Sequence, residues 1–484
     1  MSGNQRQAPL AAAMKAYAAG GALAFHTPGH KQGLGAHPLL KELITGAGLR
    51  QEVSLMAELD DLNCPNGCIR EAQALAAELY GADDAWFMVN GTTGAIQTMM
   101  MAALEPGDEV LIPRNAHRSI LGGLILTGAV PVYLPPVLDE QLGIAMGLTA
   151  ETVAEGLAAH PGAKAVLAVY PTYYGVTFDL ASVAALAHAH GAMLLVDEAH
   201  GPHLPFSGEL PAEALALGAD MAALSTHKLL GSLTQTSMLL AKGPRVNRER
   251  VRRAGSLLTS TSPNYLLLAS LDIARLQMAE YGDALVGRAV RLAEGVRAAV
   301  NDTPGLWCFG PEYLGRPGAE ALDATKLTVQ TAWLGLTGAA AETVLRRDYN
   351  LQLELTDAYN VLFLLTMADT EREAYALIKA LKDFALRHRR EPLARTRLVL
   401  PELPVRKLTP REAFFAPSEA VPFALAAGRT AAEEIGFYPP GVPLLCPGEG
   451  ITTALLEHLQ AMKEAGLRVS GPEDPALGTI RVVR

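Results

Sequence analysis

The position of one lysine, Lys228, says more about the structure of this chain than any other residue does. It lies in residues 221–240, MAALSTHKLLGSLTQTSMLL, after an apolar run and before a turn rich in Gly, Ser and Thr. The apolar run predicts a buried strand at 221–224, so Lys228 should follow the carboxyl end of that strand. A lysine there loses hydration, which favours the neutral amine that acts as a nucleophile. Because a single lysine after a strand is far more often solvated, the neighbouring residues have to support this interpretation.

A second costly residue, Asp197, precedes Lys228 by about one strand-and-helix unit. Residues 192–196, AMLLV, have the composition of a fully buried parallel strand, and Asp197 follows them directly. A carboxylate at that position requires a nearby cation. Enzymes that use pyridoxal phosphate (PLP) pair such an aspartate with the pyridinium nitrogen and hold the cofactor on a lysine as a Schiff base. The two residues together therefore predict a PLP site.

The chain resembles the fold-type I ornithine/lysine/arginine decarboxylases along nearly its whole length. The stretches that carry the resemblance are FHTPGHKQG (25–33), PRNAHRS (113–119), VDEAHGPH (196–203), STHKLLGSLTQTS (225–237) and YPPGVPLLCPGE (438–449). This resemblance implies that Lys228 holds PLP, that Asp197 keeps its ring nitrogen protonated, and that His117 stacks on its ring. It also implies a homodimer or higher homo-oligomer with the active site at the dimer interface.

Residues at strand ends are expected to bind the cofactor. A predicted strand at 85–89 leads through NGTTG (90–94) into a helix, and this pattern places backbone N–H groups and hydroxyls around a phosphate. Ser225 and His227 are expected at the same phosphate. The candidate catalytic residues are Lys228, Asp197, His117 and His227, and the candidate cofactor-binding residues are Lys228, Asp197, His117, Gly91, Thr92, Thr93, Ser225, His227 and His200. No metal ligand is predicted.

Residues 197–200 also spell DEAH, a tetrapeptide found in certain helicases. A helicase would need a phosphate loop of the type G-x-x-x-x-G-K-[ST], and the chain contains no Gly-Lys dipeptide. The 50 acidic residues also outnumber the 40 Lys and Arg, which argues mildly against nucleic acid and anionic membranes as partners. The helicase interpretation therefore fails.

Predicted strands and helices alternate between about residues 85 and 240. This alternation indicates an α/β fold with a mostly parallel sheet and helices on both faces. The resemblance makes it the aspartate aminotransferase fold of PLP-dependent transferases. We expect an N-terminal arm (1–40), a PLP-binding major domain (41–290), a smaller α+β domain (291–390) and a C-terminal decarboxylase domain (391–484), with the Arg-rich segment 387–397 as an exposed linker.

The uncharged residues 119–138 are long enough to raise the question of a membrane span. Their Gly122-Gly123 pair, Gly128 and Pro131 predict a helix, a turn and a strand instead. The N-terminus lacks the layout of a signal peptide, and the 4 cysteines are too scattered for a disulfide framework. We therefore expect a cytoplasmic enzyme without a membrane partner.

The predicted reaction is decarboxylation of a basic amino acid. Because no extra N-terminal domain is evident, the chain is similar to the short bacterial form of the family, which favours L-arginine as substrate and agmatine as product, in polyamine biosynthesis. Lysine to cadaverine and ornithine to putrescine are the alternatives. The distal cation of the substrate should meet acidic residues, and the candidates are Asp60, Glu354, Asp357 and Glu449.

Two other functional classes remain open. Another PLP reaction, such as β-elimination or transamination, would retain the substrate carboxylate on an arginine, for which Arg114 and Arg429 are candidates. The second functional class is a catalytically idle relative that acts as a regulatory binding partner. Intact Lys228 and Asp197 argue against it, because an idle copy has no physical need to keep two costly residues.

Three further segments are expected near the active site. The resemblance implies that residues 25–33 lie near the active site, where they should form part of the substrate entry. Thr172 and Tyr174 follow a predicted strand at 165–170 and should therefore line the ligand crevice. The resemblance implies that the hydroxyl-rich turn 259–263 reaches the cofactor phosphate of a partner subunit, although Ser262 could equally be the N-cap of the next helix.

Overall fold

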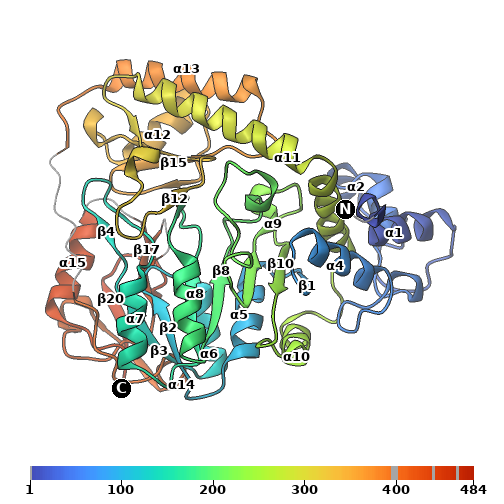
Figure 1. Cartoon of the computed structure of the whole chain (residues 1–484), viewed down its shortest axis with the longest axis horizontal. Coiled ribbons are helices and arrows are strands. Elements are labelled where there is room, and N and C mark those ends of the chain that lie inside the picture. The colour runs from blue at the N-terminus through green and yellow to red at the C-terminus, as the bar shows by residue number, and fades with distance from the viewer. Residues whose placement is uncertain (1–2, 394–401, 439–441, 465–467) are drawn as a thin grey trace. The chain divides into compact units, whose positions relative to one another are not determined.

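The protein is described by a computed structural model that covers residues 3–393, 402–438, 442–464 and 468–484 (Figure 1). The chain forms two compact units. The first consists of Met1–Ala103, Leu195–Ser207 and Ala212–Leu285, and the second of Leu104–Leu194, Gly208–Pro211 and Val286–Arg484. Both units are therefore built from segments that are distant in sequence.

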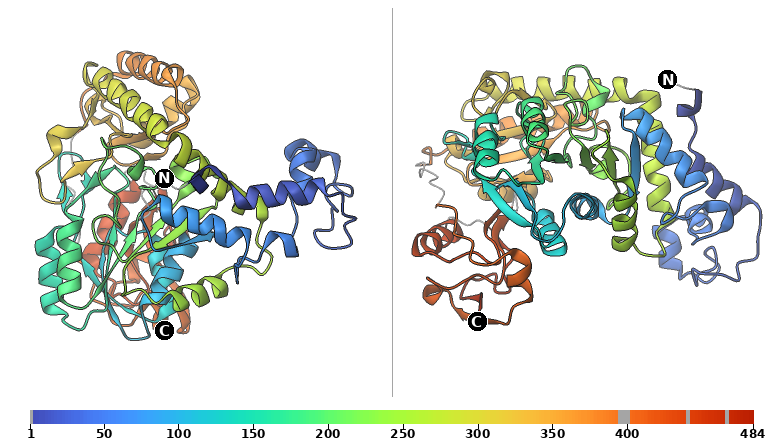
Figure 2. Two further views of the ribbon diagram at one scale, coloured as in Figure 1. Left: turned by 45° about the vertical axis from the view of Figure 1, so that its right-hand side comes forward. Right: turned by 60° about the horizontal axis from the view of Figure 1, so that its bottom comes forward.

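The N-terminal segment of the first unit is drawn in blue in Figure 2. Its elements are η1 (Gly3–Arg6), α1 (Pro9–Ala19), α2 (Pro38–Leu43), α3 (Gly46–Gln51), η2 (Ala57–Leu59) and α4 (Cys68–Leu79). Helix α1 packs against α3 and α4. Several large apolar side chains of this segment are exposed, with Phe25 at 90% and Leu34 at 86%.

A buried ion pair on α11 (Tyr265–Asn301) anchors the start of α1. The N-cap residue of α1, Ala8, has no side chain that could accept a hydrogen bond. Asp272 Oδ2 takes this role and accepts from the amide of Leu10 at 3.0 Å. Arg275 pairs with Asp272 at 3.0 Å and donates to the backbone carbonyl of Gln5 at 2.8 Å. The helix start is thus capped by a residue that is remote in sequence.

The first unit contains the end of the strand that carries Asp197 and the strand that precedes Lys228. β1 (Asp84–Met88) pairs with β10 (Ser237–Ala241), and β10 pairs with β9 (Met221–Leu224), both antiparallel. β8 (Met193–Asp197), whose residues from Leu195 belong to this unit, pairs with β9 in parallel. Helix α5 (Gly91–Ala103) packs on β9 and β10, and α10 (Arg248–Leu258) packs on α5. Both strands are wholly buried, and apart from Ser237 at the start of β10 their residues are all apolar.

The second unit begins with another parallel arrangement. β2 (Glu109–Pro113) lies between β3 (Val130–Leu134) and β6 (Ala165–Val169), parallel to both. The associated helices are α6 (Arg118–Thr127), α7 (Ala150–Ala159) and α8 (Leu180–Ala189). Among the strands described so far, β2–β3, β2–β6 and β8–β9 are parallel pairs, whereas only β1–β10 and β9–β10 are antiparallel, which confirms the predicted α/β class with a mostly parallel sheet.

The uncharged residues 119–138 form a helix, a turn and a strand, as predicted. Helix α6 ends at Gly128, which adopts a left-handed conformation with φ +73°, and β3 follows at Val130. A side chain at position 128 would be strained in that conformation. No helix of the described residues is long and apolar enough to cross a membrane.

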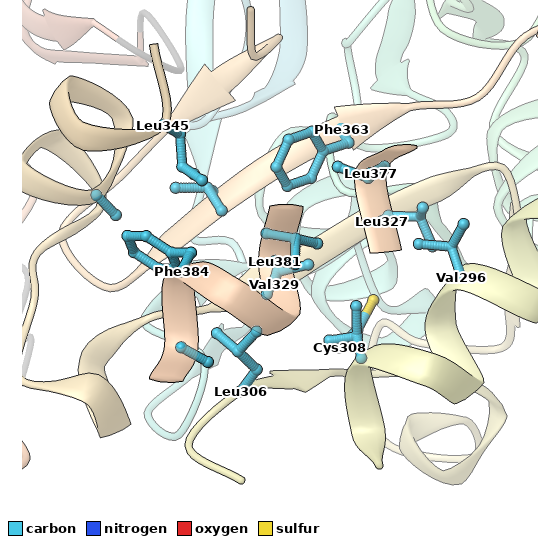
Figure 3. Packing of buried hydrophobic residues seen from close by; sticks show 14 of the residues in the cluster. Val296, Leu306, Cys308, Leu327, Val329, Leu345, Phe363, Leu377, Leu381 and Phe384 are labelled. Atoms are coloured by element: carbon cyan, nitrogen blue, oxygen red, sulfur yellow. The ribbon is translucent and has the colours of Figure 1, made fainter. Parts of the chain in front are cut away.

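Antiparallel strands form a second sheet in this unit. Its order is β11 (Trp307–Cys308), β13 (Lys326–Gln330), β15 (Asn360–Leu364) and β14 (Leu355–Thr356). Helices α12 (Gly338–Tyr349) and α13 (Glu371–His388) complete this α+β part. Figure 3 shows Leu381 and Phe384 of α13 packed with Leu327 and Val329 of β13 in its apolar core.

The C-terminal part of the second unit has its own apolar core around Ile435, Leu445 and Leu455. Its elements are α14 (Pro410–Phe415), β16 (Ser418–Pro422), β17 (Ile435–Tyr438), β18 (Val442–Leu445), α15 (Thr453–Glu464), β19 (Arg468–Ser470) and β20 (Thr479–Val483). The predicted linker at 387–397 starts too early, because α13 continues to His388. Residues 389–392 are exposed, and 394–397 lie outside the described residues.

The remaining elements are short. They are β4 (Leu138–Asp139), β5 (Ile144–Ala145), β7 (Val176–Thr177), η3 (Leu204–Phe206), α9 (Thr226–Leu229), η4 (Pro311–Tyr313), β12 (Ala321–Leu322), η5 (Ala332–Leu334) and η6 (Phe423–Leu425). One of them, α9, carries Lys228 directly after β9.

Candidate active site

Three buried hydroxyls meet at the start of α5 in the first unit. Thr92, in the first turn of α5, contacts Ser225 at the end of β9 and lies 3.0 Å from Ser237 of β10. All three side chains are almost fully buried. The structure therefore brings together two of the predicted phosphate-binding residues, and it adds Ser237, which the sequence did not single out.

The direction of these hydrogen bonds follows from the number of protons. Ser237 donates its hydroxyl proton to the carbonyl oxygen of Leu224 at 2.7 Å. Thr92 must then donate to Ser237, and Ser225 must donate to Thr92, because each hydroxyl has one proton. Ser225 is thus the first donor in the chain. It can turn its proton toward an anion without breaking the other two bonds.

The backbone at the start of α5 leaves room for such an anion. Gly91 has φ +66°, and a Cβ atom added there would meet no atom within 4 Å. Its amide donates to the carbonyl oxygen of Gln235 at 2.8 Å. The next amides, of Thr92 and Thr93, belong to a helix N-terminus, where intrahelical acceptors are lacking and the helix dipole favours negative charge. The Thr93 side chain is exposed and does not join the buried hydroxyls.

Lys228 is held next to a histidine. Its Nζ lies 3.0 Å from Nε2 of His200, which is buried in the turn after β8. A charged lysine has only donors, so a charged Lys228 requires His200 to be neutral with Nε2 as acceptor. Two cations at this distance would repel each other, so the pair favours a single positive charge. The geometry therefore places His200 where it can take up a proton from Lys228.

Asp197 is the last residue of β8 and is 4% exposed. Its Oδ1 accepts a hydrogen bond from the amide of Ala199 at 3.1 Å. The next residue, Glu198, has a different role: burial raises its pKa well above the ordinary value, and its Oε1 accepts from the amide of Ala214 at 3.0 Å. Burial thus favours the neutral form of Glu198.

The imidazole of His227 is oriented by the strand that follows it. Nδ1 lies 2.6 Å from the carbonyl oxygen of Thr236, so Nδ1 carries a proton and donates it. Nε2 is then the ring atom that can take up or give a proton. A neutral His227 presents a lone pair at Nε2, whereas only the imidazolium could donate from Nε2 to a phosphate.

His117 belongs to the second unit, where it caps α6. Its Nδ1 accepts from the amide of Ser119 at 3.2 Å and lies 2.9 Å from the Ser119 hydroxyl. The sequence-based alternative of a helix-capping turn is thus present in the structure. A cap at Nδ1 uses the edge of the ring, whereas stacking uses its face, so the two roles are compatible.

Most of the acidic candidates for the substrate cation have structural partners. Asp60 accepts hydrogen bonds from five backbone amides, including that of Gly67 at 2.8 Å. Burial opposes its charge, but the amides outweigh burial and lower the pKa of Asp60. Asp357 is buried and accepts from Tyr174 at 2.9 Å and from Asn360 at 2.8 Å. Glu354 is exposed.

The two arginine candidates for a substrate carboxylate are also paired. Arg114 binds Glu449 in the second unit, and both side chains are buried. Arg429 pairs with Glu419 at 2.7 Å on the surface. Arg114 and Glu449, which the sequence offers as candidates for binding a substrate carboxylate and a substrate cation, are ion-pair partners of each other in this structure.

The other predicted contacts have local roles in the described structure. Thr172 Oγ1 accepts from the amide of Val176 at 3.1 Å. The N-cap of α11 is Asn264, whose Oδ1 accepts from the amide of Leu267 at 3.1 Å, so Ser262 is not the cap. His30, in the N-terminal motif, pairs with Glu52 at 2.7 Å.

The residues of the first unit fit the cofactor that the resemblance implies. An amine (Lys228), a buried carboxylate at a strand end (Asp197) and a hydroxyl at a helix N-terminus (Ser225) match the aldehyde, the ring nitrogen and the phosphate of PLP. Sequence reasoning missed Ser237, Gln235 and Thr236. They lie in the same motif as Lys228, so its alternating hydroxyl residues were the available signal.

Comparisons with known proteins agree with this chemistry. Residues 8–373 match the Orn/Lys/Arg decarboxylase major domain, and residues 395–481 match the C-terminal domain. The arginine decarboxylase of Bacillus anthracis is 45% identical over 483 residues, covering 99% of this chain and 98% of that protein. The arginine decarboxylase of Bacillus subtilis is 43% identical to this chain. The alignment covers 99% of this chain and 99% of that protein.

A solved structure shares the fold. The Francisella novicida lysine decarboxylase LdcF has a TM-score of 0.85 at 23% identity, with 98% of this chain and 81% of that chain covered. The likeness extends over nearly all of this chain, so the fold includes the N-terminal and C-terminal parts as well as the strands around Lys228.

Proposed function

This chain belongs to the Orn/Lys/Arg decarboxylase family, and we propose that it converts L-arginine to agmatine and CO2. It is a PLP-dependent decarboxylase. Identity of 45% and 43% to two arginine decarboxylases over nearly the whole chain is the observation that supports arginine. The reaction would serve polyamine biosynthesis.

The residues of the site divide the work around the cofactor. PLP, when bound, supplies the electron sink for the carbon that loses CO2. Lys228 holds the cofactor through its amine. Asp197 keeps a proton on the ring nitrogen, since a buried carboxylate is stabilised by the positive charge opposite it. Ser225, together with the amides of Thr92 and Thr93, binds the phosphate.

Proton movements fall to the two histidines near the lysine. His200 accepts a proton from the Lys228 ammonium, which would leave a neutral amine able to hold the cofactor. His227, with Nδ1 fixed on Thr236, presents Nε2 as the atom that can return a proton to the substrate carbon. His117 covers the cofactor ring, a role that rests on the family resemblance.

Other reactions receive less support. Lysine and ornithine are the alternative substrates, and a lysine decarboxylase shares the fold. Transamination or β-elimination would retain the substrate carboxylate, but Arg114 and Arg429 are both in ion pairs. An idle regulatory relative would have no use for a lysine held at hydrogen-bond distance from a buried histidine.

The assembly and location of the enzyme are also proposals. Exposed large apolar side chains in the N-terminal segment, Leu23, Phe25, Leu34 and Leu43, support a homo-oligomer with a second copy covering them. We also propose that the active site lies at that interface and that the enzyme is cytoplasmic. The division into four domains expected from the sequence is part of the same proposal. Light scattering of the purified protein tests the oligomer, and a monomer that turns over substrate would contradict it.

An absorbance scan with product analysis tests the chemistry. The protein should show a visible cofactor band that borohydride abolishes, and it should release agmatine from arginine faster than cadaverine from lysine or putrescine from ornithine. Lys228→Ala should lose the borohydride-sensitive band, while Lys242→Ala, at an exposed lysine of the same unit, should keep it. A wild-type protein that stays colourless with added PLP would contradict the proposed function.

A further inference from the structure

A buried ion pair joins the C-terminal part of the second unit to the turn that carries His117. Arg114 Nη1 lies 2.5 Å from Glu449 Oε1, and Nη2 lies 2.8 Å from Oε2, a bidentate arrangement. Arg114 is 4% exposed and Glu449 is 2% exposed. Arg114 Nη2 also donates to the carbonyl oxygen of Leu444 at 2.7 Å. The pair connects residues that are 335 positions apart in the sequence.

Glu449 is itself rigidly placed. Its Oε2 accepts from the amide of Cys446 at 2.8 Å, and its carbonyl oxygen accepts from the amide of Ala431 at 2.8 Å. The preceding Gly448 has φ +92°, and a Cβ atom there would lie 2.3 Å from the carbonyl oxygen of Leu408. This segment therefore has one packed conformation, and the carboxylate has one position.

Arg114 connects the fixed carboxylate of Glu449 to the turn after β2. Its amide donates to the carbonyl oxygen of Leu134 at 3.0 Å, and its guanidinium lies 4.5 Å from the centre of the Tyr133 ring. The turn closes through the amide of Ala116, which donates to Pro113 at 3.0 Å, and His117 follows as the N-cap of α6. The backbone and the side chain of Arg114 thus fix the entry to this turn.

We propose that Glu449 is a positioning residue for the reaction. Through Arg114 it fixes turn 114–117 and thereby the imidazole of His117. The inference rests on the proposed function, because the role of His117 at the ring is taken from the family resemblance.

Direct contact of either residue with substrate does not fit the geometry. Both carboxylate oxygens of Glu449 accept hydrogen bonds, and both terminal nitrogens of Arg114 donate them. A substrate cation or carboxylate would have to displace a bidentate partner inside a buried environment. Positioning requires no such displacement.

The experiment compares three variants as holoenzymes. Glu449→Gln removes the charge with little change of shape. Arg114→Met with Glu449→Met replaces the pair by apolar side chains of similar length, which buried pairs often tolerate without loss of stability. Glu419→Gln is the matched control, because it removes the partner of Arg429 from an exposed pair in the same part of the chain.

The readouts separate positioning from folding. Visible circular dichroism reports the setting of the bound cofactor, and kcat and KM for arginine report the reaction. Melting temperature reports folding. Alkylation of Cys446, mapped by mass spectrometry, reports opening of the pair, because this thiol is buried beside Glu449 and burial raises its pKa to about 12.

Glu449→Gln should bind cofactor but change the visible dichroism and lower kcat by about a hundredfold, with KM within about threefold, because a displacement of about 1 Å in a supporting group has effects of this size. Alkylation of Cys446 should accelerate by at least about tenfold. The double Met variant should regain the melting temperature but not the dichroism or kcat. Glu419→Gln should behave as wild type.

Two results would overturn the inference. One is a Glu449→Gln enzyme whose dichroism and kcat equal those of Glu419→Gln. The other is a double Met variant that recovers kcat together with its melting temperature, since the pair would then only stabilise the fold. A wild-type protein that binds no cofactor would overturn the proposed function itself, and the wild-type control distinguishes this case.

Discussion

The buried ion pair between Asp272 and Arg275, which holds the start of α1, allows a direct test of the fold. Asp272 and Arg275 are both fully buried, and the pair caps α1 and holds the carbonyl oxygen of Gln5. We consider Asp272→Asn, which keeps the shape and one acceptor oxygen but removes the charge. Arg275 is then left buried without a counter-charge.

The expected loss follows from this geometry. Burial raises the pKa of Asp272 even though Arg275 and the amides of α1 lower it, so the intact pair is not a large net source of stability. Breaking a buried pair from one side costs about 3–5 kcal/mol. Local opening lets Arg275 hydrate and offsets part of this cost, so we expect a loss of about 3 kcal/mol, which corresponds to about a hundredfold in an opening equilibrium.

Hydrogen exchange of the α1 amides measures this opening directly. In Asp272→Asn the amides of α1 should exchange about a hundredfold faster than in wild type, while those of β9 should not change. Asp272→Leu with Arg275→Met should recover most of the protection. Glu249→Gln, which removes an exposed pair with Arg252 at 2.7 Å, is the control and should leave α1 unchanged. An Asp272→Asn protein with wild-type exchange in α1 would refute the reasoning.

Three further predictions concern the phosphate, the core and pH. Ser225→Ala should weaken PLP binding by about tenfold or more, because a hydrogen bond to a charged group is lost, but should leave binding of pyridoxal, which has no phosphate, unchanged in a fluorescence titration. Phe384→Ala, in the core of Figure 3, should lower the free energy of unfolding by about 3–5 kcal/mol in a urea titration that follows the second unit. Burial raises the pKa of Asp357, so its protonated form stabilises the fold below the ordinary carboxyl range and this contribution is lost as pH rises through the folded pKa. The melting temperature of wild type relative to Asp357→Asn should therefore fall as pH rises through this range, and a constant difference would contradict the prediction.

Local patterns in the sequence predict the strands around the site well. The apolar run at 221–224 is β9 with the same bounds, and 85–89 differs from β1 by one residue at each end. Helix α13 is the contrast, because Arg387 and His388, read from the sequence as linker, extend it. Charged residues in the last turn of a helix and in a linker look alike in sequence, so the local signal cannot separate them.

The partners of the site residues were less accessible to sequence reasoning. The sequence places Thr92 and Ser225 at strand and helix ends. The position of the Ser237 hydroxyl next to Thr92, however, depends on the antiparallel pairing of β10 with β9. The same holds for His200, which meets Lys228 only through the register of β8 and β9. Sequence periodicity reports which face is buried, and pairing across strands decides which polar atoms meet.

The four acidic residues proposed to bind the distal cation of the substrate could not be ranked from the sequence either. Their hydrogen bonds in the structure reduce the number of candidates. The carboxylate of Asp60 accepts hydrogen bonds from backbone amides, that of Asp357 from Tyr174 and from residues of its own turn, and that of Glu449 from Arg114. A carboxylate with its acceptors filled gains little from a substrate cation, because it would have to exchange one set of hydrogen bonds for another. Of the four candidates, Glu354 alone is exposed. The distal cation of arginine must therefore be met by Glu354, by a carboxylate outside this set, or by one from a second copy of the chain.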